Sequence, residues 1–331
     1  MIIVFFIINT GYNIYQNSQY DKDKQWYLTE GAADVANTWN LKNKTAKKVT
    51  VAVIDTGVDY NHEMLKGHMW KNEKEIEGNG IDDDENGFID DIIGWNFTNN
   101  TNDVLSGEEY YENDHGTECA SIISAGSEWT KYKGINYRKD VKIMSLKVLK
   151  GIEKEGNVED VIRAIKYAEN NGADICNLSL NFKEYNEKLE TVIKKSHMLF
   201  VVSAGNDAVN IDIRKIYLAS FHYDNVISVA AIDQDYELYS NSNYGKESVD
   251  IAAPGVNIYC AVVNGYDYDT GTSMSTAIVS GVAAMIMSKY DVDSASGIKH
   301  IIMQNSKRSS KLQGVVISGG MLNAYNCLRN K

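Results

Sequence analysis

The chain has 331 residues, of which 44% are hydrophobic and 24% charged, a composition typical of a soluble globular protein with one large core. The formal net charge is −12, and the stretch from Glu73 to Asp114 holds fourteen acidic residues and one lysine, so the remainder is almost neutral. The sequence has no basic stripe to meet nucleic-acid phosphates and no apolar run long enough to cross a membrane. We therefore expect neither a nucleic-acid partner nor a transmembrane segment.

Residues 1–24 are predicted to form an N-terminal tail, and residues 25–331 a single domain. The apolar run Met1–Ile8 has no preceding basic residue and no clear small-residue cleavage site, so it is a weak signal peptide. A remnant of a truncated prosegment is the other interpretation. Four cysteines in so long a chain do not indicate a disulfide scaffold, and their redox state stays open.

The segments that follow alternate between strand and helix patterns. Continuous apolar and β-branched runs predict buried strands at 48–55, 142–149, 174–180, 199–204, 226–232 and 249–253. Apolar residues at helical spacing predict helices at 32–39, 115–125, 158–170, 186–196 and 294–304, and another that begins near residue 273. This alternation predicts βαβ units. The expected fold is α/β, with a doubly wound, mostly parallel sheet covered by helices on both faces, in three layers.

Four polar residues stand where these predicted strands end or helices begin. Asp55 ends one strand and Asn206 follows another, while His115 and Ser273 each open a predicted helix. Each alone has a structural explanation, because short polar side chains cap helices and asparagine is common in turns. Together they are the parts of a catalytic triad with a side-chain oxyanion donor. The chain order Asp, His, Ser differs from that of chymotrypsin-like and α/β-hydrolase enzymes.

The motifs around these residues resemble those of the subtilisin-like serine proteases, the subtilases. The resemblance runs from about Gln25 to Leu328 and rests on five motifs in the family's order, at 53–59, 115–117, 203–206, 250–255 and 271–274. It implies a subtilisin-like fold and a serine endopeptidase that hydrolyses polypeptide substrates, with a triad of Asp55, His115 and Ser273 and an oxyanion donor at Asn206. It also implies a monomer, with a prosegment or an inhibitor acting in trans as a partner.

The resemblance assigns substrate-binding positions as well, and here the sequence departs from the family pattern. The implied positions are Ser179, Leu180, Asn181, Gly156 and Ile216. Asn181 stands where the family usually has glycine, and Ile216 would make the first specificity pocket shallow. Leu218 stands where the family often has proline, so we expect it to remove a cis peptide bond.

Further departures follow Ser273. Ser275, Ala277 and Ile278 occupy places where the family usually has alanine, proline and histidine. Alanine is a better helix former than proline, so the helix under Ser273 should be straighter. These changes, with the short segment before the domain, leave an alternative open. In it the chain is a catalytically impaired subtilase-fold pseudoprotease that acts as a binding or interaction protein.

Part of the acidic stretch resembles a calcium-binding loop. Counted from Asp82, oxygen-bearing side chains fall at positions 1, 3, 5 and 9, glycine is at position 6, and position 7 offers a backbone carbonyl. The bidentate glutamate of an EF-hand is absent, since position 12 is Ile93. Many subtilases have a similar calcium-binding insertion. A structural Ca²⁺ is therefore predicted, and a solvated acidic loop is the alternative; the expected ligands are Asp82, Asp84, Asn86, Phe88 and Asp90.

The chain is expected to be exported, either to the secretory pathway or to the extracellular space. This prediction rests on the habit of the family, on the apolar run Met1–Ile8, and on glycosylation sequons at Asn43, Asn96 and Asn99. A glycosylated asparagine must be reachable at the surface of the folded protein.

Overall fold

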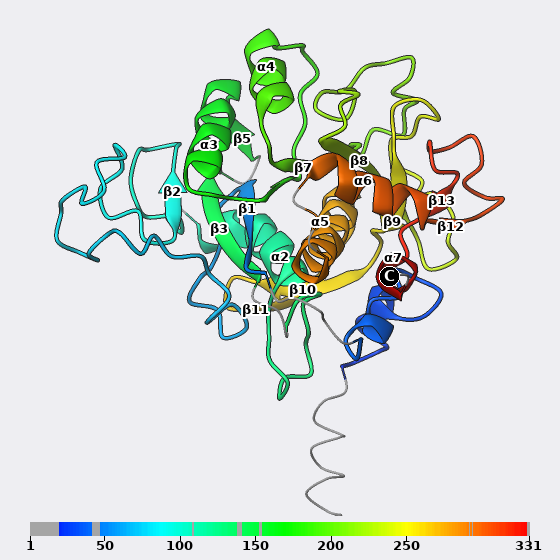
Figure 1. Ribbon diagram of the computed structural model, residues 1–331, viewed down its shortest axis with the longest axis horizontal. Coiled ribbons are helices and arrows are strands. Elements are labelled where there is room, and N and C mark those ends of the chain that lie inside the picture. The colour runs from blue at the N-terminus through cyan, green and yellow to red at the C-terminus, as the bar shows by residue number, and fades with distance from the viewer. Residues whose placement is uncertain are drawn as a thin grey trace, which may run out of the picture.

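The strands of the chain build one central sheet in a computed structural model, which describes residues 20–41, 47–107, 109–137, 141–151, 154–290, 292 and 294–329. Its nine strands lie in the order β12-β13-β9-β8-β7-β6-β1-β3-β2, and every neighbouring pair is parallel except β12 with β13 (Figure 1). The strands are β1 (Val49–Asp55), β2 (Gly94–Asn96), β3 (Val141–Lys147), β6 (Ile175–Leu178), β7 (Leu199–Ser203), β8 (Val226–Ile232), β9 (Ile251–Pro254), β12 (Lys307–Arg308) and β13 (Gly320–Met321).

Helices cover both faces of this sheet. One face is packed by α2 (Asp114–Ile123), α5 (Thr272–Lys289), α6 (Ala295–Gln304) and α7 (Ala324–Arg329), and the other by α3 (Val158–Asn170) and α4 (Glu187–Lys195). Two short hairpins lie outside the sheet, as do three 3₁₀ turns. These elements are β4 (Leu149–Lys150), β5 (Glu155–Gly156), β10 (Ile258–Val262), β11 (Gly265–Asp269), η1 (Trp26–Leu28), η2 (Ala36–Thr38) and η3 (Tyr110–Asn113).

The alternation of side chains along β1 explains why two helical layers form. Val51 and Val53 belong to the apolar cluster that includes α2 and α5, whereas Ala52 and Ile54 belong to the cluster that includes α3 and α4. A strand with apolar side chains on both sides must be covered on both sides. The predicted mostly parallel sheet with helices on both faces is therefore confirmed.

Most predicted elements agree with the observed bounds to within two residues at each end. The exceptions are short. The helix predicted at 32–39 is only the 3₁₀ turn η2, and the hairpin of β10 and β11 was not predicted. The expected loss of a cis peptide bond at Leu218 is wrong, because the Tyr217–Leu218 bond is cis.

The long helix α5 fixes the position of Ser273. It runs unbroken past Ala277, and its residues from Thr272 to Ser288 are buried. Ser275 anchors its first turn to the sheet, because its hydroxyl donates to the backbone oxygens of Ala253 and Pro254, both at 3.0 Å. Replacing the usual proline and histidine of the family has therefore left a continuous helix attached to the end of β9.

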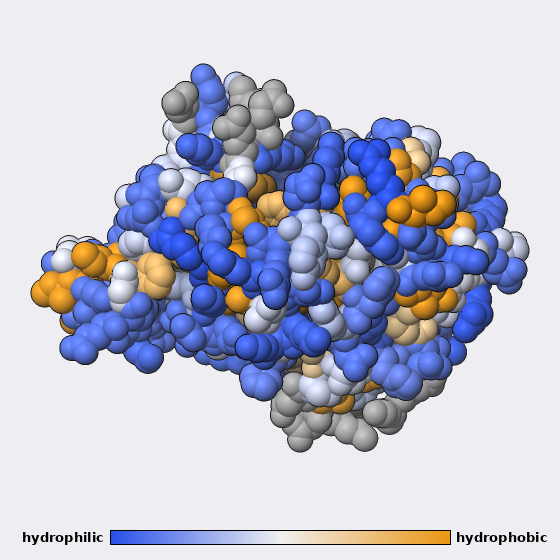
Figure 2. All heavy atoms as spheres, turned by 90° about the horizontal axis from the view of Figure 1, so that it is seen from above, coloured by the Kyte–Doolittle hydropathy of each residue, from blue (hydrophilic) through white to orange (hydrophobic). Residues whose placement is uncertain are grey.

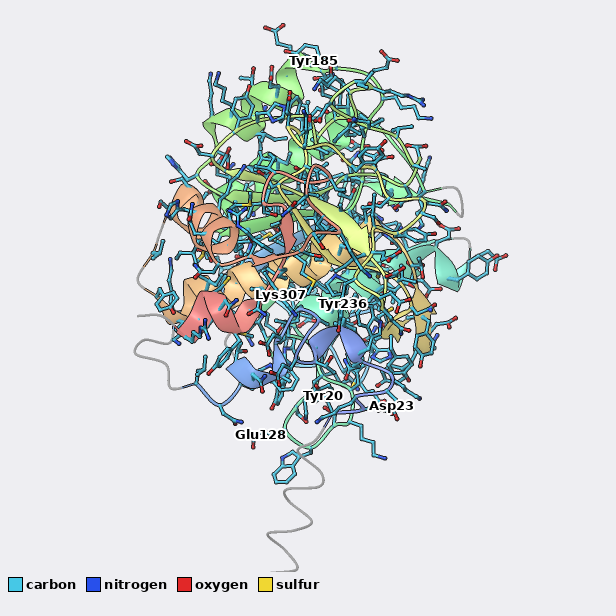
Figure 3. All side chains as sticks on the ribbon, turned by 90° about the vertical axis from the view of Figure 1, so that its right-hand side faces the viewer. Tyr20, Asp23, Glu128, Tyr185, Tyr236 and Lys307 are labelled. Atoms are coloured by element: carbon cyan, nitrogen blue, oxygen red, sulfur yellow. The ribbon has the colours of Figure 1, made fainter. Side chains whose placement is uncertain are left out.

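Residues 1–19 of the predicted tail lie outside the described residues. The tail residues nearest the domain contact it, since the Tyr20 and Trp39 rings meet edge to face at 5.3 Å and the Asp21 N–H donates to the Lys131 oxygen. Figure 3 shows Tyr20, Asp23 and Glu128 at this end of the molecule. Farther up, the same view shows Lys307 beside Tyr236, its ammonium 5.7 Å from the ring centroid.

The sequons differ in whether their asparagines are exposed to solvent. Asn43 lies outside the described residues, whereas Asn96 is fully buried and its amide donates to the Asp103 oxygen and the Ser106 hydroxyl. Asn99 is exposed. Asn96 therefore cannot carry a glycan in the folded protein. All four cysteines are buried free thiols, and a bilayer-spanning helix is not found in the part of the chain that the structure describes.

Hydrophilic residues cover most of the face shown in Figure 2, interrupted by several hydrophobic patches. Figure 2 shows a hydrophobic patch at the left tip, the side on which the acidic loop projects in Figure 1. Three isoleucines of this loop are exposed, Ile76, Ile81 and Ile89. The acidic loop thus combines clustered carboxylates with exposed apolar side chains.

The burial of α5 predicts a large stability difference between two isoleucine truncations. Ile278→Ala removes a fully buried side chain from the core and should lower the free energy of unfolding by about 2–5 kcal/mol. Ile213→Ala removes a side chain that is 84% exposed and should change it by less than about 0.5 kcal/mol. Urea unfolding of the two variants checks this, and equal costs would mean that α5 does not pack as described.

Candidate active site

Asp55 and His115 form the central pair of the site. Asp55 is the last residue of β1 and His115 the second residue of α2, and His115 Nδ1 lies 2.7 Å from Asp55 Oδ1. Burial raises the pKa of Asp55, but the His115 charge and the hydrogen bonds from His115 and Thr56 outweigh burial and lower this pKa below its usual value. An ionised Asp55 can only accept, so Nδ1 carries the hydrogen and Nε2 faces outward as the reactive atom.

Two glycines let the helix of His115 approach the end of β1. A Cβ on Gly116 would lie 2.0 Å from the Gly57 oxygen, and one on Gly57 would lie 2.1 Å from the Val104 oxygen. Gly57 also has φ +104°, a conformation that side chains disfavour. The Gly116 N–H then donates to the Thr56 hydroxyl at 3.0 Å. Gly116 is thus required by the contact between α2 and the turn after β1, and Gly57 by its own conformation and its closeness to Val104.

Ser273 lies in the first turn of α5, on the helix that packs against α2. Its side chain is 9% exposed, and its hydroxyl donates to the Ser179 oxygen at 3.4 Å. Ser179 returns a hydrogen bond from its own hydroxyl to the Ser273 oxygen at 3.1 Å. A hydrogen bond from Ser273 to His115 is not formed in the described structure. Catalytic hydrogen bonds are often long before substrate binds, so this geometry does not exclude a triad.

Asn206 is held beside Ser273 by Thr272. The Asn206 Oδ1 accepts both the backbone N–H and the hydroxyl hydrogen of Thr272, each at 3.0 Å. These two bonds fix which end of the amide faces α5, and they direct its Nδ2 donor away from Thr272. The N–H groups in the first turn of a helix have no partner within the helix. The Asn206 amide and the Ser273 N–H are therefore both suited to hold an oxyanion.

The predicted substrate-binding residues fall into two groups. Ser179, Leu180 and Asn181 continue from β6, and of these only Asn181 is exposed. Ile216 is buried in the hydrophobic core. Gly156 in β5 lines a separate pocket of about 200 Å³, which none of the other predicted substrate-binding residues lines.

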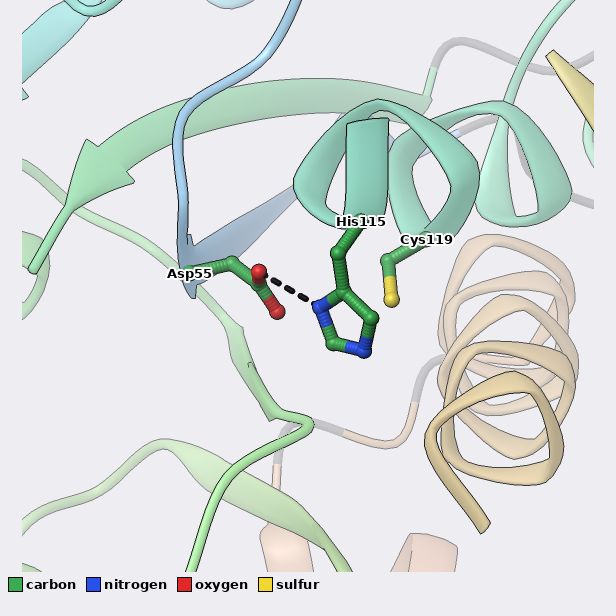
Figure 4. Close-up of side chains that lie close together, drawn as sticks. All are labelled: Asp55, His115 and Cys119. Atoms are coloured by element: carbon green, nitrogen blue, oxygen red, sulfur yellow. Dashed lines mark hydrogen bonds and ion pairs between the residues drawn. The ribbon is translucent and has the colours of Figure 1, made fainter. Parts of the chain in front are cut away.

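Cys119 lies one turn after His115, and its sulfur is close to both members of the central pair (Figure 4). The potential ligand atoms of Asp55, His115 and Cys119 all lie within 4.8 Å of one another. Burial raises the pKa of the Cys119 thiol well above its usual value, and the Asp55 carboxylate adds to this. A protonated thiol is a poor metal ligand. The hydrogen-bonded Asp–His pair therefore fits the geometry better than a metal centre.

A second acid accompanies the site. Glu118 follows His115 on α2 and shares a hydrogen bond with Asp269, which lies just before the turn that leads to Ser273. Burial, together with the Asp269 charge and this bond, raises the pKa of Glu118 to about 9. Glu118 is therefore protonated at neutral pH and joins α2 to the end of β11. Sequence reasoning missed Glu118, because the separation of Glu118 and Asp269 along the chain follows no motif.

The acidic loop gathers a set of carboxylates that differs from the predicted one. Oxygens of Glu75, Asp82 and Asp84 lie within 4.8 Å of one another. All three carboxylates also accept backbone N–H groups of the loop, as Asp90 does from residues 78–80 and the Asn86 oxygen from Phe88. Glu75 was missed because it precedes the loop motif by seven residues, and no spacing rule reaches it.

The sequence is similar to those of known proteins. The sequence model of the Subtilase family matches residues 46–319. The chain is 31% identical to subtilisin-like protease 1 of Plasmodium berghei, covering 95% of this chain and 55% of that protein. It is 36% identical to subtilisin-like protease 1 of Plasmodium falciparum, covering 81% of this chain and 41% of that protein. The chain thus spans about half the length of these relatives.

Two other similarities support the same assignment. A thermophilic serine proteinase of a Bacillus species is 31% identical, over 95% of this chain and 68% of that protein. The solved structure of an epidermin leader peptide processing serine protease from Staphylococcus aureus shares the fold with a TM-score of 0.71 at 23% identity, covering 93% of this chain and 81% of that one. On the matched motifs, the fold and these relatives, the chain belongs to the subtilase family.

Proposed function

We propose that the protein is a serine endopeptidase that cleaves polypeptides, with Ser273 as nucleophile, His115 as general base, Asp55 as the carboxylate that orients it, and Asn206 as oxyanion donor. The observation that carries the proposal is the 2.7 Å bond between His115 Nδ1 and Asp55. This bond leaves Nε2 free to accept a proton. Family membership supports the same reaction.

The chemistry follows from the side chains. As the Ser273 hydroxyl attacks a peptide carbonyl carbon, His115 Nε2 takes its proton, and Asp55 stabilises the imidazolium that results. The carbonyl oxygen, now an oxyanion, accepts from the Asn206 amide and the Ser273 N–H. His115 then gives the proton to the leaving amine. Water, activated by the same base, attacks the acyl ester and restores Ser273.

Without substrate, the Ser273 hydroxyl donates to the Ser179 oxygen, so substrate binding must release this hydroxyl to let it face His115. The hydroxyl donates to a backbone oxygen at 3.4 Å, a long and weak contact. Segment 179–181 is also the predicted binding strand for the acyl side of the substrate. A substrate that pairs with this segment therefore lies beside Ser273, where the hydroxyl can turn toward His115.

A serine-reactive fluorophosphonate probe tests the nucleophile. Folded wild-type protein should become labelled, and Ser273→Ala should lose the label, because the probe esterifies only an activated serine. Ser288→Ala is the matched control, because Ser288 is a buried serine at the opposite end of α5, and it should still be labelled. Folded wild-type protein that takes no Ser273-dependent label would favour the pseudoprotease alternative.

Asn206→Asp tests the oxyanion donor without removing the bonds that position it. The aspartate keeps an oxygen for Thr272 but replaces the donor with a negative charge facing the oxyanion. We expect kcat to fall by at least tenfold while KM changes by less than about threefold, because the lost interaction exists mainly in the transition state. Steady-state kinetics on a chromogenic peptide measure both constants. A raised KM with normal kcat would assign Asn206 to ground-state binding instead.

A structural Ca²⁺ in the acidic loop is part of the same proposal. Three carboxylates held within 4.8 Å repel one another unless a cation neutralises them, and oxygen donors of this kind suit Ca²⁺. Glu75, Asp82 and Asp84 would hold the ion, and its charge would stabilise the fold of the loop. Export, a monomeric state, and a prosegment or inhibitor acting in trans stay predictions.

Chelation tests the calcium site. With calcium at about a hundred times its dissociation constant, the ion adds about 2.7 kcal/mol, so removing it should lower the melting temperature by about 5 °C or more. Asp84→Asn should largely abolish this chelator effect. Glu77→Gln removes an exposed acid from the same loop and should keep it. Differential scanning fluorimetry suffices, and an unchanged effect in Asp84→Asn would place the ion elsewhere.

A further inference from the structure

Lys147 is a buried lysine at the active-site end of the sheet. It is the last residue of β3 and 1% exposed, and it pairs in register with Asp55 on the neighbouring strand β1. Side chains of paired residues on parallel strands point to the same face. Val51 and its partner Ile143 both lie in the apolar cluster of α2 and α5, so Lys147 projects toward the same helices as Asp55.

The ammonium of Lys147 joins the two segments that carry Asp55 and His115. Its Nζ donates to the backbone oxygen of Thr56, the residue after Asp55, and to Asn113 Oδ1 at 3.1 Å, two residues before His115. Thr56 in turn donates its N–H to Asp55 Oδ1 at 2.7 Å. A continuous set of hydrogen bonds therefore runs from the turn before α2 to the carboxylate that His115 contacts.

This arrangement is costly for stability. An ammonium taken out of water loses solvation that two neutral oxygens only partly replace. Burial lowers the pKa of Lys147 to about 8, although the carboxylates of Glu112, Asp55 and Asp103 oppose this shift. A methionine could occupy a similar volume with no charge to bury. Lys147 therefore contributes to the arrangement of the two turns that it bonds, rather than to the net stability of the fold.

We infer that Lys147 is a positioning residue, which rests on the proposed function: its ammonium holds the turn after Asp55 against the turn before His115 and so fixes the angle at which His115 faces Ser273. Lys147 touches neither the substrate nor the reacting atoms. Small displacements of a base from its acceptor have large effects on rate, up to about a hundredfold for 1 Å. The inference therefore concerns turnover and not substrate affinity.

Lys147→Met is the first test. It keeps most of the unbranched side chain and removes both donated bonds, so kcat should fall about 10–100-fold while KM changes by less than about threefold. Lys142→Met on the same strand is the matched control, because Lys142 donates to the Gly67 oxygen outside the site. Leu189→Ala, a buried truncation on α4, controls for lost stability alone. Both controls should keep kcat.

A double variant tests whether Lys147 acts through Asn113. If both act through one bridge, Lys147→Met with Asn113→Ala should lower kcat little more than the worse single change does. Independent roles would instead multiply the two losses. Multiplied losses, or a normal kcat in folded Lys147→Met, would overturn the inference.

Proton NMR separates this inference from the proposed function. The His115 Nδ1 hydrogen, bonded to Asp55, should give a low-field resonance that His115→Ala removes. In Lys147→Met it should shift or broaden, and in Lys142→Met it should not. If the resonance depends on Lys147 in this way but the wild-type protein takes no fluorophosphonate label, the proposed function fails and the positioning role of Lys147 stands. A resonance unchanged in Lys147→Met overturns the positioning role even in an active enzyme.

Discussion

The close contact between the start of α2 and the turn after β1 is the constraint on which the site depends. Gly116 brings the two backbones so near that a Cβ on it would clash with the Gly57 oxygen. At that separation the His115 ring meets Asp55 at 2.7 Å. The contact also explains why glycine directly follows His115 in the sequence. A larger residue at position 116 would push α2, and His115 with it, away from Asp55.

Ionisable groups buried around this contact are each held by specific partners. Glu118 is kept protonated by burial and by Asp269, and it joins α2 to the strand that leads into Ser273. Lys147 joins the turns on the other side. A buried charge is poorly suited to stabilising a fold, but its directional bonds favour one arrangement over its neighbours. Glu118 and Lys147 therefore help to fix the geometry of the site rather than to stabilise the fold.

The strands and helices could be predicted from the sequence because their apolar periodicity is strong, as in 48–55 and 158–170. The four polar residues of the site could be found because strand ends and helix starts are visible in the same pattern. The contacts between residues far apart in the sequence could not be predicted. Glu75 joins Asp82 and Asp84 only after the acidic loop folds, and the Lys147 bridge depends on strand register. Neither relation has a fixed spacing along the chain.

The replacements after Ser273 are the strongest departure from the family, and the structure gives them a physical account. The Ser275 hydroxyl donates to two carbonyls at the end of β9, which a family alanine could not do, and it lies where a Cβ on Gly255 would clash. The first turn of α5 is therefore tied to the sheet by a polar anchor. Since Ser273 belongs to that same turn, the anchor also holds Ser273 near the end of β9. The serine at position 275 is thus accounted for by the two carbonyls that its hydroxyl faces.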